Sequence, residues 1–273
     1  MRKEMFAALL ALGLIGVSCS SDDSSSNNGN GTRPNQHIKY ITNVDTFYLE
    51  DGVMEQDSKV VMQYSTANRL ESMQSTELGS EDEPNNTGNI KFVYGASSKL
   101  EKVGEASELK LVSDMLLYKN DAYKMGKVLK YDNRKNPIEI LVYNEEKEQD
   151  ILKVTYDEKP FFAFHTLRAA GIIEAIDGVS LNFAAPSTPP QLKLAKELIP
   201  TNNPVALQII DHTGRVLTDL KITYQYDDKN YPKVAVMHAT HQYEAIVAIK
   251  DNKPVYGWKT STEESKVNLT YKE

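Results

Sequence analysis

From His37 to the C-terminus, hydrophobic and polar residues alternate along much of the chain. In KITYQYD, which begins at Lys221, an isoleucine and two tyrosines fall on one side of an extended strand, and lysine, threonine and glutamine fall on the other. KVNLTYK, which begins at Lys266, alternates in the same way. A period of two predicts half-buried β-strands, and about fourteen such segments at short intervals favour antiparallel hairpins over parallel strands joined by helices.

A short motif recurs where these strands end. YSTANRLESM, YGASSKLEKV, YDNRKNPIEI and YDDKNYPKVA each consist of a tyrosine, four or five mainly polar residues, and then a leucine or proline; they start at Tyr64, Tyr94, Tyr131 and Tyr226. YDEKPFFAF, from Tyr156, is a shortened copy. Residues of this kind form tight turns, so each copy predicts a β-hairpin, and repeated hairpins predict a meander. We therefore predict a mainly β protein, an antiparallel meander rolled into a barrel-like structure or a long curved sheet.

Tyrosine is the commonest aromatic residue, with 15 copies against 7 phenylalanines and one tryptophan. A tyrosine ring has an apolar body and a polar tip, so it suits an open sheet face. We expect the rings to pack on such a face with their hydroxyls reaching water.

Residues 161–204 break the alternation. HTLRAAGIIEAI and STPPQLKLAKELIP have helical spacing, and the second has Ser187 or Thr188 as an N-cap and Pro200 at its end. We predict one or two short helices inserted near 161–204. Helices inserted into a sheet protein usually cover an open edge or plug the mouth of a barrel, and a lid or binding element is the functional alternative.

The N-terminus has the features of an export signal. Two basic residues precede an apolar run from Phe6 to Val17, which is shorter than the roughly 20 apolar residues of a spanning helix. The single cysteine of the chain, Cys19, directly follows this run and Ser18. We predict a lipoprotein signal peptide over residues 1–18, cleavage between Ser18 and Cys19, and a lipid on Cys19. The alternative is that Cys19 is incidental and the chain is cut elsewhere.

Residues 19–36 are rich in serine, asparagine, glycine and aspartate and contain no large hydrophobic side chain after Cys19. Such a composition predicts a disordered tether, followed by a single β-rich domain over 37–273. The net charge is −7, and no cluster of lysine and arginine is visible. This excludes nucleic acid as an expected partner, because phosphate binding needs a basic face.

Several of these motifs resemble those of one group of bacterial proteins. Gly16-Val17-Ser18-Cys19 resembles the bacterial lipobox, although Gly16 stands where leucine is usual, and SSDDSSS resembles the acidic export signal of Bacteroidota lipoproteins. The hairpin motifs loosely resemble the tyrosine-aspartate repeats of the Rhs type. Over residues 37–273 the chain resembles the Bacteroidota surface lipoproteins that form a domain-of-unknown-function family with a porin-like fold. The resemblance implies a closed or nearly closed β-structure at the outer membrane, facing the exterior, and implies no catalytic residues.

The residues that usually carry catalysis or bind metals form no recognisable constellation in this sequence. Of the five histidines, only those of HATH, His238 and His241, are closely spaced, and residues three apart on a strand face opposite sides. Acidic pairs fall in polar turns, where a carboxylate lacks the burial that acid–base catalysis requires. We therefore predict a non-enzymatic protein without a metal or cofactor.

The remaining candidates for ligand contact are aromatic residues that could stack on sugars or pack against a protein. They are Tyr118, Tyr123, Tyr131, Tyr143, Tyr256 and Trp258. The structural alternative is that these rings pack on one another across neighbouring strands. We expect a surface lipoprotein that binds an external glycan or protein; the alternatives are a structural accessory subunit of an outer-membrane assembly and a hydrolase. A long exposed aromatic groove would favour a glycan, and an apolar patch of several hundred Å² would favour a protein.

Overall fold

The computed structural model describes eight stretches of the chain. They are residues 38–79, 84–95, 100–103, 106–107, 124–143, 149–173, 198–251 and 253–273. The predicted signal peptide and tether, Cys19, Tyr118, Tyr123 and most of the second predicted helix lie outside the described residues.

The described residues form a sheet of thirteen strands, in the order β6-β5-β4-β3-β2-β1-β13-β12-β11-β10-β9-β8-β7. The strands are β1 (Tyr40–Glu50), β2 (Val53–Tyr64), β3 (Leu70–Glu77), β4 (Asn86–Tyr94), β5 (Leu100–Val103), β6 (Ala106–Ser107), β7 (Lys124–Tyr131), β8 (Pro137–Tyr143), β9 (Gln149–Pro160), β10 (Asn202–Ile210), β11 (Val216–Tyr226), β12 (Pro232–Lys250) and β13 (Lys253–Lys272). Each strand pairs with its neighbours in antiparallel fashion. The predicted mainly β, antiparallel fold is confirmed.

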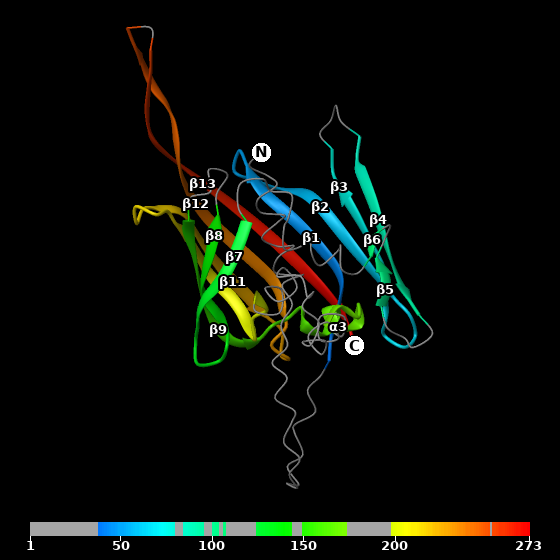
Figure 1. The fold of residues 1–273 in the computed structure, drawn as a ribbon. Coiled ribbons are helices and arrows are strands. Elements are labelled where there is room, and N and C mark those ends of the chain that lie inside the picture. Colours follow the sequence, from blue (N-terminus) through cyan, green and yellow to red (C-terminus); the bar gives the residue numbers. More distant parts are fainter. Residues whose placement is uncertain are drawn as a thin grey trace.

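Two meanders make up this sheet. Strands β1 to β6 run outward in one direction and β13 back to β7 in the other, and the two series meet where β1 pairs with β13. Figure 1 shows the sheet bent into a trough, with β3–β6 in one wall and β7–β12 in the other. Within the described residues, β6 and β7 each pair on one side only, so the sheet is not closed. Of the two predicted forms, the long curved sheet is therefore confirmed.

In the described part of the predicted 161–204 insertion lies a short helix, α3 (Phe164–Ala169). It sits at one end of the trough in Figure 1. Thr166 Oγ1 accepts a hydrogen bond from the backbone N–H of Ile41 at 2.9 Å, which fixes the helix to β1. The chain leaves the helix through Gly171, where φ is +74° and a Cβ atom would stand 3.0 Å from Leu100 Cβ. The helix thus packs against the sheet as a part of the core. No described helix has the length and apolar character needed to cross a membrane.

The larger hydrophobic cluster joins the insertion to both meanders. Its members include Ile41, Leu70, Phe161, Phe162, Leu167, Leu220 and Val267, all nearly inaccessible to solvent. A smaller cluster consists of Val128, Ile140, Val142, Leu152 and Val154 on β7–β9. These side chains come from alternate positions of their strands, as the period of two predicts.

Four hairpins share one five-residue turn, which begins at Ser65, Asp132, Asp211 or Asp227. In each, the N–H of the first residue donates to the carbonyl of the fifth, and the fourth residue has positive φ: Asn68 (58°), Lys135 (67°), Gly214 (90°) and Asn230 (65°). In the three aspartate turns, Oδ1 accepts the N–H groups of the third and fifth residues at 2.8 to 2.9 Å. The hairpins predicted from Tyr64, Tyr131 and Tyr226 are confirmed.

The shortened motif from Tyr156 forms no hairpin. Tyr156 and Asp157 lie within β9, which continues to Pro160. The Asp157 carboxylate accepts a hydrogen bond from the Tyr226 hydroxyl and another from the N–H of Lys159. Because its carboxylate bonds across strands, the aspartate does not start a turn here, and the chain continues to α3.

Five strand tyrosines use their hydroxyls in a way the sequence analysis did not predict. Each donates a hydrogen bond to a carbonyl near the start of the preceding strand: Tyr64 to Ile41 at 2.6 Å, Tyr94 to Leu70 at 2.7 Å, Tyr156 to Pro137 at 2.9 Å, Tyr224 to Pro204 at 2.9 Å and Tyr271 to Pro232 at 2.8 Å. Burial raises the pKa of four of these phenols far above the ordinary range, namely Tyr64, Tyr156, Tyr224 and Tyr271. For these residues the expectation that the hydroxyl reaches water is wrong.

Candidate functional site

Strands β12 and β13 are much longer than their neighbours. They have 19 and 20 residues, whereas β11 and β1 have 11 each. The pairing of β12 with β11 ends at His241, and the pairing of β13 with β1 ends at Ser265. Among the described residues, 242–250 and 253–260 therefore pair only with each other. We call this two-stranded segment the ribbon; it projects beyond the sheet (Figure 1), and nine residues at about 3.3 Å each make it about 30 Å long.

One face of the ribbon carries a row of apolar side chains. Trp258 lies opposite Glu244, Tyr256 opposite Ile246, and Pro254 opposite Ile249. Residues directly opposite each other in an antiparallel pair point to the same face, and so do residues two apart. Ile246, Ile249, Pro254, Tyr256 and Trp258 therefore share one face, which we call the apolar strip. Its four large side chains are exposed, from 45% for Trp258 to 74% for Ile249.

The opposite face is also apolar, because the ribbon contains a bulge. The register between β12 and β13 shifts between Ile246 and Ala248, so Val247 is the extra residue. A Cβ atom built on Gly257 would meet both methyl groups of Val247 at 3.0 Å, which places the valine over the glycine. Val247 and Val255 are 50% and 40% exposed. The ribbon thus presents apolar surface on both of its faces.

The indole of Trp258 is held in place by an arginine from a neighbouring turn. The Arg215 guanidinium carbon lies 3.7 Å from the centroid of the indole ring. Arg215 is the last residue of the five-residue turn that begins at Asp211, and its N–H donates to the Asp211 carboxylate at 2.8 Å. This stacking contact covers one face of the indole. The turn chemistry of the β10–β11 hairpin therefore orients an aromatic side chain at the base of the ribbon.

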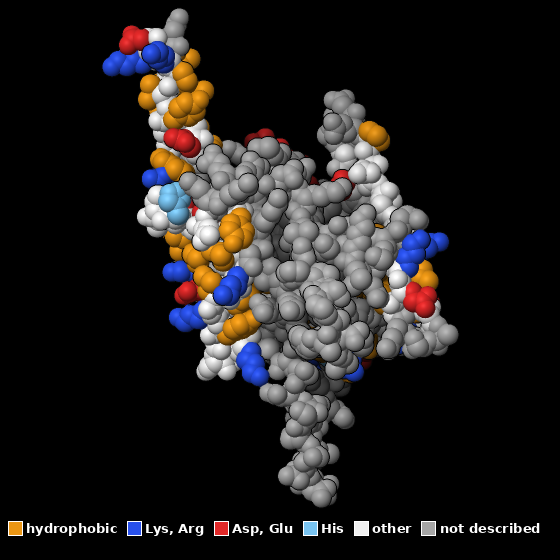
Figure 2. All heavy atoms as spheres, in the orientation of Figure 1, with side chains coloured by type: hydrophobic (Ala, Val, Ile, Leu, Met, Phe, Trp, Pro, Cys, Tyr) orange, Lys and Arg blue, Asp and Glu red, His pale blue; other side chains and the backbone are white. Residues whose placement is uncertain are grey.

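Charged residues mark the tip of the ribbon. Lys250 pairs with Lys253, and Asp251 between them has φ of 50°. Figure 2 shows orange side chains along the projecting ribbon and lysine and aspartate at its tip. The six exposed large side chains of the ribbon present roughly 600 Å² of surface in total, divided between its two faces. Ile246, Ile249, Tyr256 and Trp258 account for most of it, so the apolar strip alone is a patch of several hundred Å².

Of the four predicted ligand-contact aromatics that lie in the described residues, the structure brings together Tyr256 and Trp258. Tyr131 pairs with Pro137, and Tyr143 pairs with Lys124, so these two tyrosines lie at opposite ends of the β7–β8 hairpin. They do not form a shared platform. The isoleucines of the apolar strip were not among the predicted contact residues, although the run AIVAI in β12 has no polar residue on either face.

The two histidines of HATH lie on opposite faces of β12. His238 Nδ1 is 3.1 Å from a carboxylate oxygen of Glu264, and His241 Nε2 is 4.0 Å from Glu263. His241 Nδ1 also lies 3.2 Å from the hydroxyl of Thr218. Each histidine thus pairs with its own glutamate, and in the described part of the chain no three histidine, cysteine or acidic side chains meet in a group that could hold a metal.

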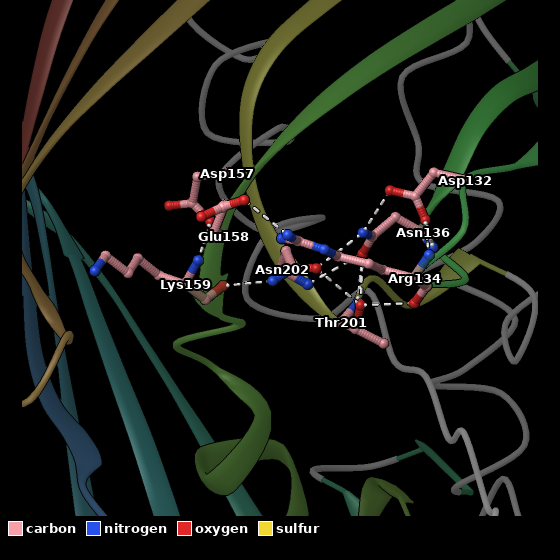
Figure 3. A network of polar contacts seen from close by, with 8 residues as sticks. All are labelled: Asp132, Arg134, Asn136, Asp157, Glu158, Lys159, Thr201 and Asn202. Carbon is pink, nitrogen blue, oxygen red and sulfur yellow. Dashed lines mark hydrogen bonds and ion pairs between the residues drawn. The ribbon is translucent and has the colours of Figure 1, made fainter.

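A network of polar residues joins the β7–β8 turn to the start of β10 (Figure 3). At its centre, the Asn136 side chain is fully buried; its Nδ2 donates to Asp132 at 2.9 Å and to Asn202 at 3.0 Å. Its Oδ1 accepts the N–H groups of Thr201 at 2.7 Å and of Asn202 at 3.0 Å. Since the protein itself satisfies every polar group of the Asn136 amide, we assign this network a structural role.

Comparison with known proteins gives weak similarities only. No protein-family model and no curated protein matches the chain. Similar solved structures include a porin-like protein from Bacteroides uniformis, with a TM-score of 0.34 and 8% identity over 85% of this chain and 98% of that one. A LolA superfamily protein from Nitrosomonas europaea has a TM-score of 0.28 and 10% identity over 96% and 91%. An outer membrane lipoprotein-sorting protein domain from Vibrio parahaemolyticus has 0.27 and 8% over 85% and 83%. Similarity of this extent assigns no family, activity or ligand.

Proposed function

We propose that the protein is a non-enzymatic binding lipoprotein, held at the outer membrane by a lipid on Cys19 and displayed at the cell exterior, which contacts a partner protein through the ribbon. The observation that carries the proposal is the apolar strip, a patch of several hundred Å² on an element that no described strand covers. Burial of such surface drives protein association.

The geometry favours a protein over a glycan as the ligand. Sugars stack on open aromatic faces, but Arg215 already covers one face of Trp258. Tyr131 and Tyr143 lie at opposite ends of a hairpin and offer no continuous groove. Beside Tyr256, the exposed apolar side chains of the ribbon are those of Ile246, Val247, Ile249 and Val255, which pack on apolar protein surface and offer a sugar no hydrogen bonds.

The predicted tether supports this role. Seventeen residues separate Cys19 from His37, and a flexible chain of that length has a mean end-to-end distance of roughly 25 Å. A domain tethered in this way stays close to the membrane and can still turn its ribbon toward a partner. Replacing Cys19 with alanine should release the protein from membranes; if the variant stays membrane-bound after a salt wash, the anchor is wrong.

The binding role is tested by photo-crosslinking on intact cells. p-Benzoylphenylalanine at position 256 places the reactive group on the apolar strip, and the same amino acid at Lys233, an exposed position in the body of β12, is the matched control. We expect ultraviolet light to produce a discrete covalent adduct from position 256 and none from position 233. Absence of any adduct from position 256, with the variant displayed at normal levels, would exclude the ribbon as a protein-binding element.

A further inference from the structure

The two outer edges of the ribbon are not equivalent. The edge of β12 is interrupted by the bulge at Val247, and bulges hinder the addition of another strand. The edge of β13 from Lys253 to Glu264 contains no register shift on its own strand, and no described strand pairs with it. Apart from Pro254, which has no N–H, the backbone groups along its outer edge form an open template for one more strand.

An occupant of this edge must satisfy two requirements at once. It must cover apolar side chains, and it must pair with backbone groups that have no partner strand among the described residues. A lipid surface covers apolar side chains but supplies no regular row of donors and acceptors, and a glycan does not match the repeat of a strand. An extended polypeptide edge meets both requirements.

The sequence of the β13 edge is complementary to itself. In an antiparallel pairing of two identical strands about Gly257, each Tyr256 lies opposite the Trp258 of the other copy, and each Val255 lies opposite Lys259. Lys253 then lies opposite Ser261, so no two like charges face each other between 253 and 261. Aromatic pairs across strands are stabilising, and an aliphatic residue packs on the stem of a lysine. By contrast, pairing about Tyr256 would place Lys253 opposite Lys259, twice.

We propose that two copies of the protein pair through the outer edges of their β13 strands, antiparallel about Gly257, and so form a four-stranded ribbon. The proposal rests on the assigned role of the ribbon as a protein-binding element and names its partner. The pairing brings Val255, Tyr256 and Trp258 of each copy together and adds the backbone edge, whereas the exposed side chains of β12 stay outside it. The contact is therefore smaller than the roughly 800 Å² per partner of a standard interface, as expected for a weak dimer. The contact is isologous, as in most two-fold homodimers.

Sedimentation equilibrium of the mature chain carrying Cys19→Ser tests the pairing. We expect a monomer–dimer equilibrium in the micromolar range. Tyr256→Lys places a charge opposite Trp258 and should weaken the dimer by about 100-fold or more, as expected for a central interface residue. Val93→Lys, at an exposed apolar position of β4 outside the ribbon, is the matched control and should change it less than about fivefold. A wild-type chain that stays monomeric at 100 µM, or a dimer abolished by Val93→Lys and kept by Tyr256→Lys, overturns the proposal.

Disulfide trapping tests the register. The Cys19→Ser chain has no other cysteine, so Val255→Cys and Lys259→Cys each introduce a single thiol. In the proposed register these positions face each other only between different copies. Mixing the two variants should give a covalent dimer, and neither variant alone should do so. If both variants cross-link alone as readily as in the mixture, the register is wrong. If the chain is monomeric but benzoylphenylalanine at position 256 captures another protein on cells, this pairing fails and the binding role of the ribbon stands.

Discussion

The turn that begins at Asp227 provides the sharpest test of how this sheet is held together. Asp227 Oδ1 accepts the N–H groups of Lys229 at 2.8 Å and Tyr231 at 2.9 Å. Its other oxygen lies 2.9 Å from Lys39 Nζ at the start of the first meander, and the Asp227 side chain is only 12% exposed. One carboxylate thus closes the β11–β12 hairpin and ties it to the chain before β1.

Replacing Asp227 with alanine removes all three interactions. Hydrogen bonds to a charged group contribute about 1.5 to 3 kcal/mol each, and water replaces some of them in an open turn, so we expect a loss of about 3 kcal/mol in the free energy of unfolding. Asp227→Asn keeps an oxygen for the two N–H groups and loses only the ion pair, so it should cost about 1 kcal/mol. With an m-value of about 3 kcal/mol per molar urea, the midpoint should fall by about 1 M for alanine and about 0.3 M for asparagine.

The pH dependence gives the same prediction a second readout. Burial alone would raise the pKa of Asp227, but the hydrogen bonds from Lys39, Tyr231 and Lys229 outweigh it and hold the pKa below its ordinary value of 3.8. A lowered pKa in the folded state means that the carboxylate contributes its full stability well above 3.8 and loses it as the pH falls through the folded pKa. The difference between wild type and Asp227→Ala should therefore be constant from pH 7 to about 5 and shrink toward pH 3.

Urea unfolding followed by far-ultraviolet circular dichroism at pH 7 and pH 3 measures both effects. If the alanine and asparagine variants lost the same free energy of unfolding, the hydrogen bonds from the N–H groups of the turn to Asp227 would contribute nothing to stability. A loss below about 0.5 kcal/mol for alanine, or a difference that does not change with pH, would refute the reasoning altogether.

Further predictions concern single groups elsewhere in the molecule. Gly171→Ala should lower the free energy of unfolding in urea by about 3 kcal/mol, because φ is +74° and the new Cβ would lie 3.0 Å from Leu100. Gly52→Ala, where φ is +82° but the space is open, should lower it by about 1 kcal/mol, and equal losses would contradict this prediction. Tyr156→Phe should lose about 1 kcal/mol because its hydroxyl bonds a carbonyl of β8, and a neutral result would contradict that bond. Trp258 should show the acrylamide quenching of a half-exposed indole in the monomer and reduced quenching at concentrations where the dimer forms.

Turn chemistry explains why much of the fold could be predicted from the sequence. The five-residue turns depend on groups within five positions of one another, such as the Asp132 carboxylate and the N–H of Asn136. The same signal also marks the turn at Asp211, which lacks the preceding tyrosine that the repeated motif required. By contrast, nothing in the neighbouring sequence distinguishes Asp157 from the aspartates that begin turns. Its carboxylate accepts a hydrogen bond from Tyr226, which lies 69 residues later in the chain.

Features that depend on distant pairing could not be predicted. The period of two in β13 is the same where the strand pairs with β1 and where it does not, because alternation records faces and not edges. The end of that pairing at Ser265 follows from the length of β1, which lies more than 200 residues earlier in the chain. For the same reason the sequence identified Tyr256 and Trp258 as candidates without showing that they stand on a projecting ribbon.

The residue composition of the ribbon nevertheless carries information about what contacts its faces. A strand with one solvated face alternates apolar and polar residues, and a strand covered on both faces does not. AIVAI belongs to the second kind, yet Ile246, Val247 and Ile249 are each at least half exposed. The bulge at Val247 and the lysines at the tip protect one edge and the end of the ribbon from chance pairing. The β13 edge, with Tyr256 and Trp258 beside it, lacks a bulge. An element that is protected on one edge and open on the other is suited to one specific partner strand.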